Sequence, residues 1–256
     1  MVFLENNKAF LNEIGDLARF TGRFFREVFR PRYEFSEFVH QCFVFGYTSL
    51  SLVGLTAFIM GLVLTMQLRP SMVRYGVEAQ IPAMVCIAIV REIGPVITAL
   101  IFAGKIGSSI GAELGSMRVT EQIDAMEVSG TNPFKYLVVT RTLAATLMLP
   151  VLVIIADAIS LYGSYLGVNI YEVLSFKLFT AQVIANLAYY DAIPAIVKTF
   201  FFGFAVGIVG CYKGYYSTKG TEGVGRSANS AVVMSSVLIF ILDLLAVQLT
   251  ELVWNL

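Results

Sequence analysis

The sequence predicts an all-α integral membrane protein, with an N-terminal amphipathic helix lying in the membrane plane followed by five transmembrane helices. Three observations predict this class. Hydrophobic residues make up 57% of the 256 positions and charged residues only 14%, where a soluble domain carries roughly a quarter. The mean hydropathy is +0.76. Five stretches are also long and apolar enough to cross about 30 Å of hydrocarbon at about 1.5 Å per residue.

The N-terminal region, residues 1–40, is expected to hold the in-plane helix. Apolar residues recur there at helical spacing while arginines occupy much of the opposite surface, namely Phe10, Ile14, Leu17, Phe24 and Val28 against Arg19, Arg23, Arg26 and Arg30. Such a helix fits the headgroup plane of a membrane better than a span. The alternative is a soluble amphipathic helix packed on a partner protein.

The bundle, residues 41–256, completes a single transmembrane domain that spans 1–256. Its five spans are expected near Phe43–Leu68, Ile81–Ser108, Phe134–Leu166, Ala192–Tyr212 and Ala231–Trp254. The third is long enough to tilt or to protrude from the bilayer. Charged residues interrupt the N-terminal region and leave no apolar core for a cleavable signal peptide, so the first span is expected to be an uncleaved anchor.

The distribution of lysine and arginine predicts the orientation. Thirteen basic residues fall on one side, namely Lys8, Arg19, Arg23, Arg26, Arg30, Arg32, Lys105, Arg118, Lys135, Arg141, Lys213, Lys219 and Arg226. Three fall on the other side, namely Arg69, Arg74 and Lys177, while Arg91 and Lys198 lie inside spans. Because basic loops stay in the cytoplasm, the N-terminus is expected inside and the C-terminus outside.

Several classes of function are disfavoured. The formal net charge is zero, so no overall field favours nucleic acid as a partner. Cys42, Cys86 and Cys211 lie far apart in apolar sequence and fit small buried residues better than a disulfide or redox site. His40 is the only histidine, which argues against a multi-histidine metal site. We therefore expect no metal and no catalytic residue.

The segment "AGKIGS" at residues 103–108 superficially resembles a phosphate-binding loop. That loop needs a glycine where Ala99 stands and a serine or threonine where Ile106 stands. We therefore expect no nucleotide on this chain, and any energy must come from another subunit. Gly107, Gly111 and Gly115 instead form a small-residue ladder, which is typical of closely packed membrane helices.

The loop between the second and third spans, "GAELGSMRVTEQIDAMEVSGTNP" at residues 111–133, predicts a short helix. Thr120 is expected to cap its N-terminus, and Glu121 and Asp124 in the first turn match the positive end of the helix dipole. Gly130 and the Asn132-Pro133 pair are expected to end it.

This short helix, Thr120 to Val128, is amphipathic. Ile123 and Met126 share one face, and Glu121, Asp124 and Glu127 spread over the other. A helix of two or three turns cannot bury its apolar face against its own small loop, so we expect a docked partner. The alternative is a helix resting on lipid, which its acidic face disfavours because cytoplasmic leaflets are anionic.

Two blocks of sequence resemble a known family. "REIGPVITALIFAGKIGSSIGAELGSMRVTEQIDAMEVSGTNPFKYLVVTR", residues 91–141, resembles the signature block of the MlaE/YrbE permease family. "GTEGVGRSANSAVV", residues 220–233, resembles its second block but departs from it at Ser227, Ala228 and Asn229. The similarity extends over essentially the whole chain.

The resemblance implies a homodimeric membrane subunit of an ABC lipid transporter in the bacterial inner membrane. It implies that separate ATPase subunits, which hold the ATP and magnesium, dock on the Thr120–Val128 helix. It also implies an MCE-domain protein on the outer side and, in some systems, a STAS-domain protein on the ATPases. The substrate would be phospholipid or a related lipid.

Charges inside the spans are the candidate lipid pathway. A charge at the centre of a bilayer costs at least about 2.5–3.5 kcal/mol, so buried charges usually mark a pathway or a pairing. Glu92 and Lys198 are expected at similar depth, where they could pair or jointly contact a zwitterionic lipid head. The family resemblance implies a lipid-holding cavity at these two positions. Pro95 is expected to bend the second span and so widen that cavity.

Arg91 is a further candidate for the lipid pathway, whereas three aspartates in or near the spans are weaker candidates. Arg91 is expected to point away from Glu92, toward a partner protomer, because successive residues of an α-helix diverge. Asp157 and Asp191 are expected near the outer ends of spans, and Asp243 is expected to form a structural hydrogen bond.

Three alternatives stay open. The buried charges could simply lock helices together. The chain could be a scaffold that recruits an ATPase and an envelope protein without carrying lipid. An intramembrane lipid-modifying enzyme is the third, although the sequence lacks HExxH, a histidine inside a span and a clear Ser/Lys pair.

Overall fold

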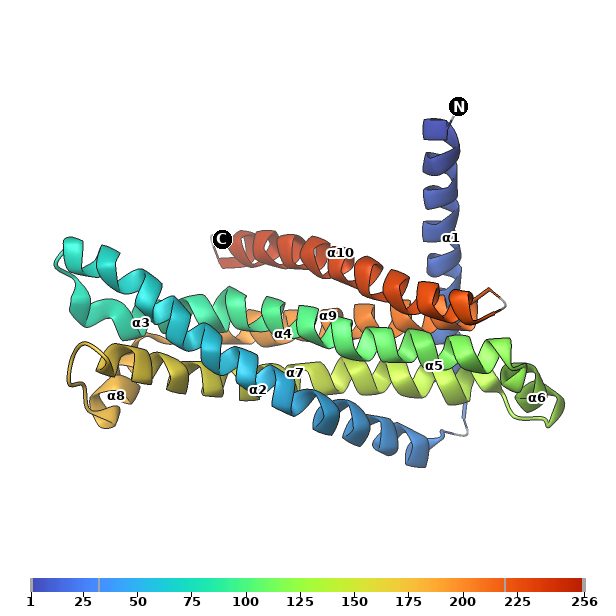
Figure 1. Cartoon of the computed structure of the whole chain (residues 1–256), viewed down its shortest axis with the longest axis horizontal. Helices are drawn as coiled ribbons and strands as arrows, with labels where there is room; N and C mark the ends of the chain where they lie inside the picture. Colours follow the sequence, from blue (N-terminus) through green and yellow to red (C-terminus); the bar gives the residue numbers. More distant parts are fainter. Residues whose placement is uncertain (1, 32, 219, 255–256) are drawn as a thin grey trace.

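The computed structural model describes residues 2–31, 33–218 and 220–254, and it places side chains for residues 12–31, 33–218 and 220–253. These residues form helices and no strands, which confirms the predicted all-α class. Figure 1 shows long helices running together along one axis. Helix α1 (Val2–Val28) crosses them at one end, and the short α8 (Phe176–Asn186) lies at the other. Arg32 and Lys219, which contributed to the predicted orientation, lie outside the described residues.

Five helical stretches are long and apolar enough to cross a membrane, as predicted. They are α2 (Phe35–Arg74), the composite stretch Glu78–Val119, the stretch Phe134–Asn169, α9 (Tyr189–Tyr215) and α10 (Thr221–Trp254). Each extends beyond its predicted bounds at one end or both, because the helix continues past the apolar segment into polar flanks. With 40 residues, α2 is about 60 Å long, twice the thickness of the hydrocarbon core.

Two of the five stretches change helix type along their length. The second span consists of η1 (Glu78–Gln80), α3 (Ile81–Ala88), η2 (Ile89–Ile93), α4 (Gly94–Phe102), η3 (Ala103–Gly107) and α5 (Ser108–Val119). The third consists of η4 (Phe134–Val139) and α7 (Thr140–Asn169). η2, η3 and η4 are π-helical, with hydrogen bonds one residue longer than in an α-helix.

The small-residue ladder of the second span packs against α9 and α10. A Cβ atom added at Gly111 would lie 3.2 Å from the Cα atom of Ala228, and one added at Gly107 would lie 3.3 Å from Cγ1 of Val206. At Gly115 it would lie 2.8 Å from Oγ of Ser227. The Ser227 hydroxyl donates a hydrogen bond to the Gly111 carbonyl at 3.0 Å. The predicted close packing is therefore confirmed.

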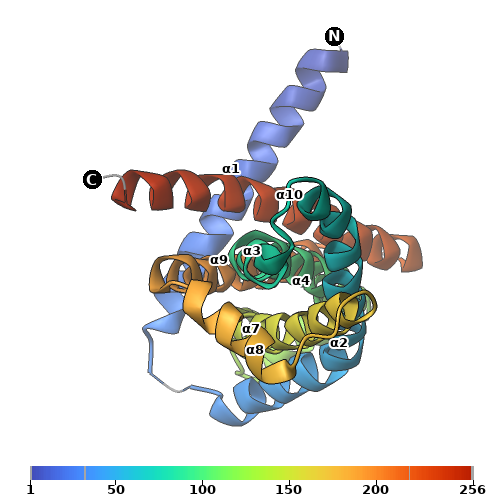
Figure 2. The same ribbon diagram turned by 90° about the vertical axis from the view of Figure 1, so that its left-hand side faces the viewer.

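Helix α1 packs against its own chain. Phe20 and Phe24 are buried, and the Phe20 ring lies 4.9 Å from the ring of Phe134 and 5.6 Å from that of Tyr212. Of the predicted apolar face, Leu17, Phe24 and Val28 contact the core, Ile14 is exposed, and the side chain of Phe10 lies outside those described. Figure 2 shows α1 passing along the side of the bundle and extending beyond it. Its position in the headgroup plane remains a prediction.

Candidate functional site

Lys198 lies at the centre of a charged cluster between the second span, α9 and α10, in which the side chains of Arg91 and Glu92 are partly exposed. It belongs to α9, and only 5% of its side chain is exposed. Its Nζ atom lies 2.7 Å from Oε2 of Glu92 in η2 and 2.8 Å from Oδ1 of Asp243 in α10. The ammonium group therefore donates to carboxylates from two other membrane-spanning stretches. Glu92 and Lys198 are therefore paired in this structure, which is one of the two arrangements that the sequence left open.

Arg91 belongs to the same cluster, contrary to the prediction that it points elsewhere. Its Nη1 atom lies 3.8 Å from Oδ1 of Asp191, a buried residue in the first turn of α9. Its Nε atom lies 4.0 Å from Oε1 of Glu92. The prediction was wrong because it assumed α-helical geometry, whereas Arg91 and Glu92 lie in a π-helical turn that holds more residues and spreads successive side chains less.

Four of the five charged side chains border a small cavity, namely Arg91, Glu92, Asp191 and Lys198, and the charges of the whole cluster do not cancel. With every group ionised, two cations face three carboxylates: Arg91 and Lys198 against Glu92, Asp191 and Asp243. The cavity also has apolar walls, from residues such as Pro194 and Ala246, and its volume is about 20 Å³. This is room for water and too little for a lipid headgroup. A lipid would therefore need the surrounding helices to move apart.

Pro95 shapes the second span from a buried position and does not line the cavity. Proline has no backbone N–H, and in an α-helix its ring would collide with the carbonyl group four residues earlier, here that of Arg91. The π-helical turn η2 ends directly before this site, where the Gly94 amide donates to the carbonyl group of Ile89, five residues back. Pro95 thus accompanies the turn from which Arg91 and Glu92 project.

Asp157 in α7 faces the other side of the same turn. A Cβ atom added at Gly94 would lie 1.9 Å from Oδ1 of Asp157, so any larger residue would force the carboxyl group to move. The Oδ1 atom of Asp157 is buried and has no hydrogen-bond partner among the described residues. Asp157 therefore lies at the depth of Gly94, well inside the bundle, and its predicted place near an outer end was wrong.

The chemistry available to this cluster is polar binding. Its side chains offer cationic donors and carboxylate acceptors, which suit a zwitterionic or cationic group. Within the described part of the chain, no three His, Cys, Asp or Glu side chains are grouped so that they could hold a metal ion. The "AGKIGS" segment lies in a membrane-spanning stretch, where the Lys105 ammonium donates to the carbonyl group of Thr48.

The short helix predicted between the second and third spans is present as α6 (Gln122–Val128), but Thr120 does not cap it. Thr120 ends α5, and its hydroxyl donates to the Ser116 carbonyl at 2.9 Å. The residue before α6 is Glu121, in a left-handed conformation with φ of 59°. The predicted cap was wrong because the chain turns sharply at Glu121 and leaves Thr120 in the preceding helix.

The apolar face of α6 is not free for a partner. Ile123 is 1% exposed and Met126 packs against the main core, so the expectation of an uncovered apolar face was wrong. The side chains of Glu121, Asp124 and Glu127 are exposed, as is Val128. Asp124 forms an ion pair of 2.5 Å with Arg118 of α5. The surface that α6 presents is therefore acidic with one apolar residue at its end.

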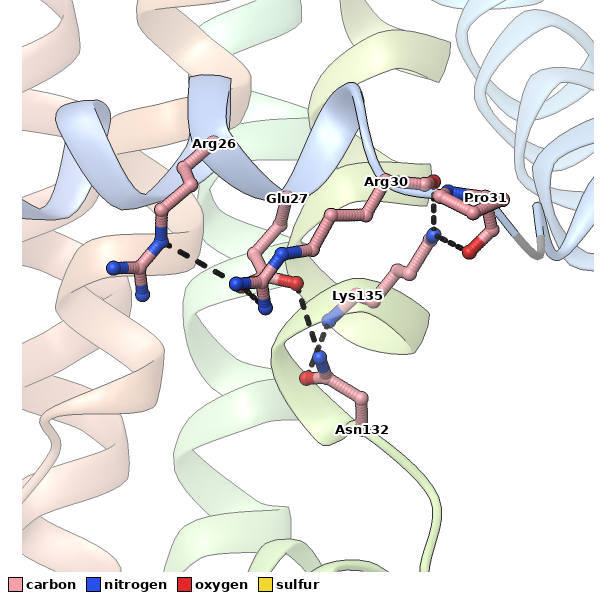
Figure 3. A network of polar contacts seen from close by, with 6 residues as sticks. All are labelled: Arg26, Glu27, Arg30, Pro31, Asn132 and Lys135. Atoms are coloured by element: carbon pink, nitrogen blue, oxygen red, sulfur yellow. Dashed lines mark hydrogen bonds and ion pairs between the residues drawn. The ribbon is translucent and has the colours of Figure 1, made fainter.

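The loop after α6 is bound to the end of α1, as Figure 3 shows. Oε2 of Glu27, which is buried, accepts a hydrogen bond of 3.2 Å from the Asn132 amide. The Lys135 ammonium donates to the backbone carbonyl groups of Arg30 and Pro31, at 2.6 Å and 3.0 Å. Through these contacts α1 and α6 are attached to the same segment, which leads into the third span.

Comparisons with known proteins identify relatives that are membrane permeases. The sequence profile of the family described as Permease MlaE matches residues 38–249. A probable ABC transporter permease protein of Rickettsia felis is 40% identical over 243 residues, which cover 94% of this chain and 93% of that protein. A probable ABC transporter permease of Synechocystis is 34% identical, over 86% of this chain and 84% of its own length. The chloroplastic protein TRIGALACTOSYLDIACYLGLYCEROL 1 of Arabidopsis thaliana is 35% identical, over 77% of this chain and 57% of that protein.

Proposed function

The chain belongs to the MlaE permease family, and from this premise we propose that it moves phospholipid or a related lipid between the inner membrane and the outer envelope. Its relatives are named as ABC transporter permeases, so it is a multi-pass membrane permease without enzymatic activity that works with an ATPase partner. The name of the Arabidopsis relative is that of a galactolipid, which supports a lipid as the transported molecule.

The observation that carries this proposal is the Lys198 cluster. Five charged side chains from three membrane-spanning stretches meet between the helices, although isolated charges in a bilayer are costly. An excess of carboxylates beside two cations provides complementary sites for both charges of a zwitterionic headgroup. Glu92, Lys198 and Arg91 would contact the lipid when the helices separate, and Pro95 would act through the turn that it accompanies.

The remaining parts of the proposal concern assembly. The chain would form a homodimer in the bacterial inner membrane, with its N-terminus in the cytoplasm and its C-terminus outside. ATPase subunits, which hold the ATP and magnesium, would dock on the exposed acidic surface of α6. An MCE-domain protein would take up or deliver lipid on the outer side, and a STAS-domain protein would bind the ATPases. The proposal includes no nucleic acid.

Transport by the reconstituted complex tests the role of the cluster. The triple variant Glu92→Gln, Lys198→Met, Asp243→Asn removes the charges while keeping side chains of similar size. We expect it to assemble with the ATPase and hydrolyse ATP, but to lose at least 90% of the transfer of fluorescent phospholipid between donor and acceptor vesicles.

A second ion pair provides the control. Arg69 and Glu172 lie 3.4 Å apart near the end of the bundle that holds α8, away from the cluster. The variant Arg69→Met, Glu172→Gln should transfer lipid at the rate of the unmodified complex. If the triple variant also transfers lipid at that rate, the charges only lock helices and the proposed pathway is wrong.

A further inference from the structure

A hollow lies between α1 and the last turns of α9, far from the Lys198 cluster along α9. Its volume is about 520 Å³. The side chains that line it come from two elements only: Asp16, Arg19, Phe20 and Arg23 from α1, and Tyr212 and Tyr216 from α9 and its C-cap. It is thus much larger than the cavity at the cluster, and transport as proposed above makes no use of it.

The residues of this hollow suit a phosphate group. Arg19 and Arg23 carry guanidinium groups, which bind phosphate through paired hydrogen bonds. Arg23 lies over the ring of Phe134 at 4.3 Å and has no carboxylate within ion-pair distance in the described part of the chain. Arg19 pairs with Asp16 at 3.4 Å on the exposed surface, where such a pair is weak. The hollow therefore keeps a net positive charge of one.

Aromatic side chains form the rest of the lining of the hollow. Tyr212 and Tyr216 pack against each other and against Phe20, with ring centroids 5.6 to 5.8 Å apart. Their hydroxyl groups form no hydrogen bond with other described residues, so both can donate to a ligand. An apolar body with a polar tip is the property that places tyrosine at membrane interfaces.

The position of the hollow along α9 matches the level of the lipid headgroups. With 27 residues, α9 is about 40 Å long, whereas the hydrocarbon core is about 30 Å thick. Tyr212 and Tyr216 lie at its very end, where α1 crosses the bundle (Figure 1). A phospholipid whose phosphate group binds here can place its acyl chains alongside the helices.

We propose that this hollow binds the phosphate headgroup of an anionic phospholipid from the surrounding leaflet, and so fixes α1 against the bundle. This lipid is a bound component and not the transported molecule. The proposal requires only that the chain lies in a membrane, so it does not depend on the Lys198 cluster.

Native mass spectrometry of the full-length chain, released from detergent with phosphatidylglycerol or phosphatidylcholine added, tests the proposal. We expect phosphatidylglycerol to be retained at least fivefold better, since one basic residue near an anionic surface contributes roughly a fivefold preference. Arg19→Gln and Tyr216→Phe should each reduce the preference, and Asp16→Asn should increase it. Arg26→Gln removes a charge from the same helix outside the hollow and should leave the preference unchanged.

Three outcomes would overturn the proposal. Equal retention of the two lipids would show that no anionic headgroup is selected. A loss in Arg26→Gln as large as that in Arg19→Gln would show only diffuse attraction to a basic helix. Loss of the bound lipid in the Glu92→Gln, Lys198→Met, Asp243→Asn variant would place it at the cluster instead.

Competition with glycerol 3-phosphate distinguishes lipid from soluble phosphate. Retention of phosphatidylglycerol in millimolar glycerol 3-phosphate would support a site that also needs the acyl chains. Displacement of the lipid at that concentration would identify a soluble phosphate ester as the ligand, and the lipid proposal would be wrong.

Discussion

Lys198 joins three membrane-spanning stretches through one ammonium group. Its partners Glu92 and Asp243 come from η2 and α10, and the lysine itself is almost fully buried. For charges that are largely buried, forming the ion pair adds little to the stability of the folded chain, but removing one partner costs much more. Removing one member leaves the opposite charges uncompensated in a medium that solvates them poorly.

We therefore predict that Lys198→Met alone destabilises the protein more than removal of all three charges. The single variant leaves two facing carboxylates and should lose roughly 1–3 kcal/mol, less than a fully buried pair would, because Glu92 is 38% exposed. The triple variant Glu92→Gln, Lys198→Met, Asp243→Asn should stay within about 1 kcal/mol of the unmodified chain. Thermal unfolding in detergent, monitored by tryptophan fluorescence or by aggregation, shows which variant is the less stable. Equal melting temperatures for the two variants would contradict the prediction.

The depth argument that paired Glu92 with Lys198 could also have found Asp243. Lys198 lies nine residues after the start of α9 and Asp243 eleven before the end of α10, which are rises of roughly 14 and 17 Å from those two helix ends. Asp191 was harder to place, because its contact with Arg91 depends on how far a long side chain reaches. Sequence spacing fixes the depth of a residue, but not the direction of its side chain.

At the scale of elements, the π-helical turn η2 determines the direction in which the charged side chains of the second span point. It presents Arg91 and Glu92 to α9, and it brings Gly94 directly against Asp157 of α7. The proline in the sequence predicted a disturbance at this place. It did not predict that the helix would widen into a π-helical turn instead of bending, because the form of the turn depends on packing against α7 and α9.

Gly94→Ala tests how tightly this turn is packed. The added methyl group would overlap Asp157, so we expect the variant to lose about 1–3 kcal/mol of stability. Gly104→Ala, in the π-helical turn η3, is a matched control because a Cβ atom there meets nothing within 4 Å. Asp157→Ala should rescue Gly94→Ala in part, because the added Cβ atom would still lie 2.9 Å from the carbonyl oxygen of Ile89. Thermal melts of the unmodified chain and the three variants decide this, and a melt of Gly94→Ala like that of Gly104→Ala would refute the packing argument.

At the scale of the whole molecule, five spans and the short helix α6 were predictable because apolar length and loop chemistry are local properties. The orientation of α6 was not, since the core that covers Ile123 is assembled from distant helices. The same holds for α1, whose buried Phe20 contacts residues of the third and fourth spans. What a face is buried against depends on tertiary structure, which spacing alone does not specify.

The exposed acidic surface of α6 gives a prediction about the assembled transporter. Charge reversal at Glu121 and Glu127 should reduce copurification of the ATPase at least tenfold, because the variant presents cations where the docked subunit meets carboxylates. The membrane subunit should keep its melting temperature, since both side chains are exposed. Reversal of Glu222, exposed at the start of α10, is the control. Full retention of the ATPase after the double reversal would contradict docking at α6.

The π-helical turn at Ile89–Ile93 also determines what the deletion of a single residue in the second span would do. Because η2 accommodates an additional residue, deleting one residue there would let the span revert to an uninterrupted α-helix without changing its ends. The segments on either side would keep their register, and only the side chains within the turn would change direction. The direction in which Arg91 and Glu92 point is therefore set by residue number as well as residue type. A single-codon deletion could redirect both charges at once, which no substitution could do.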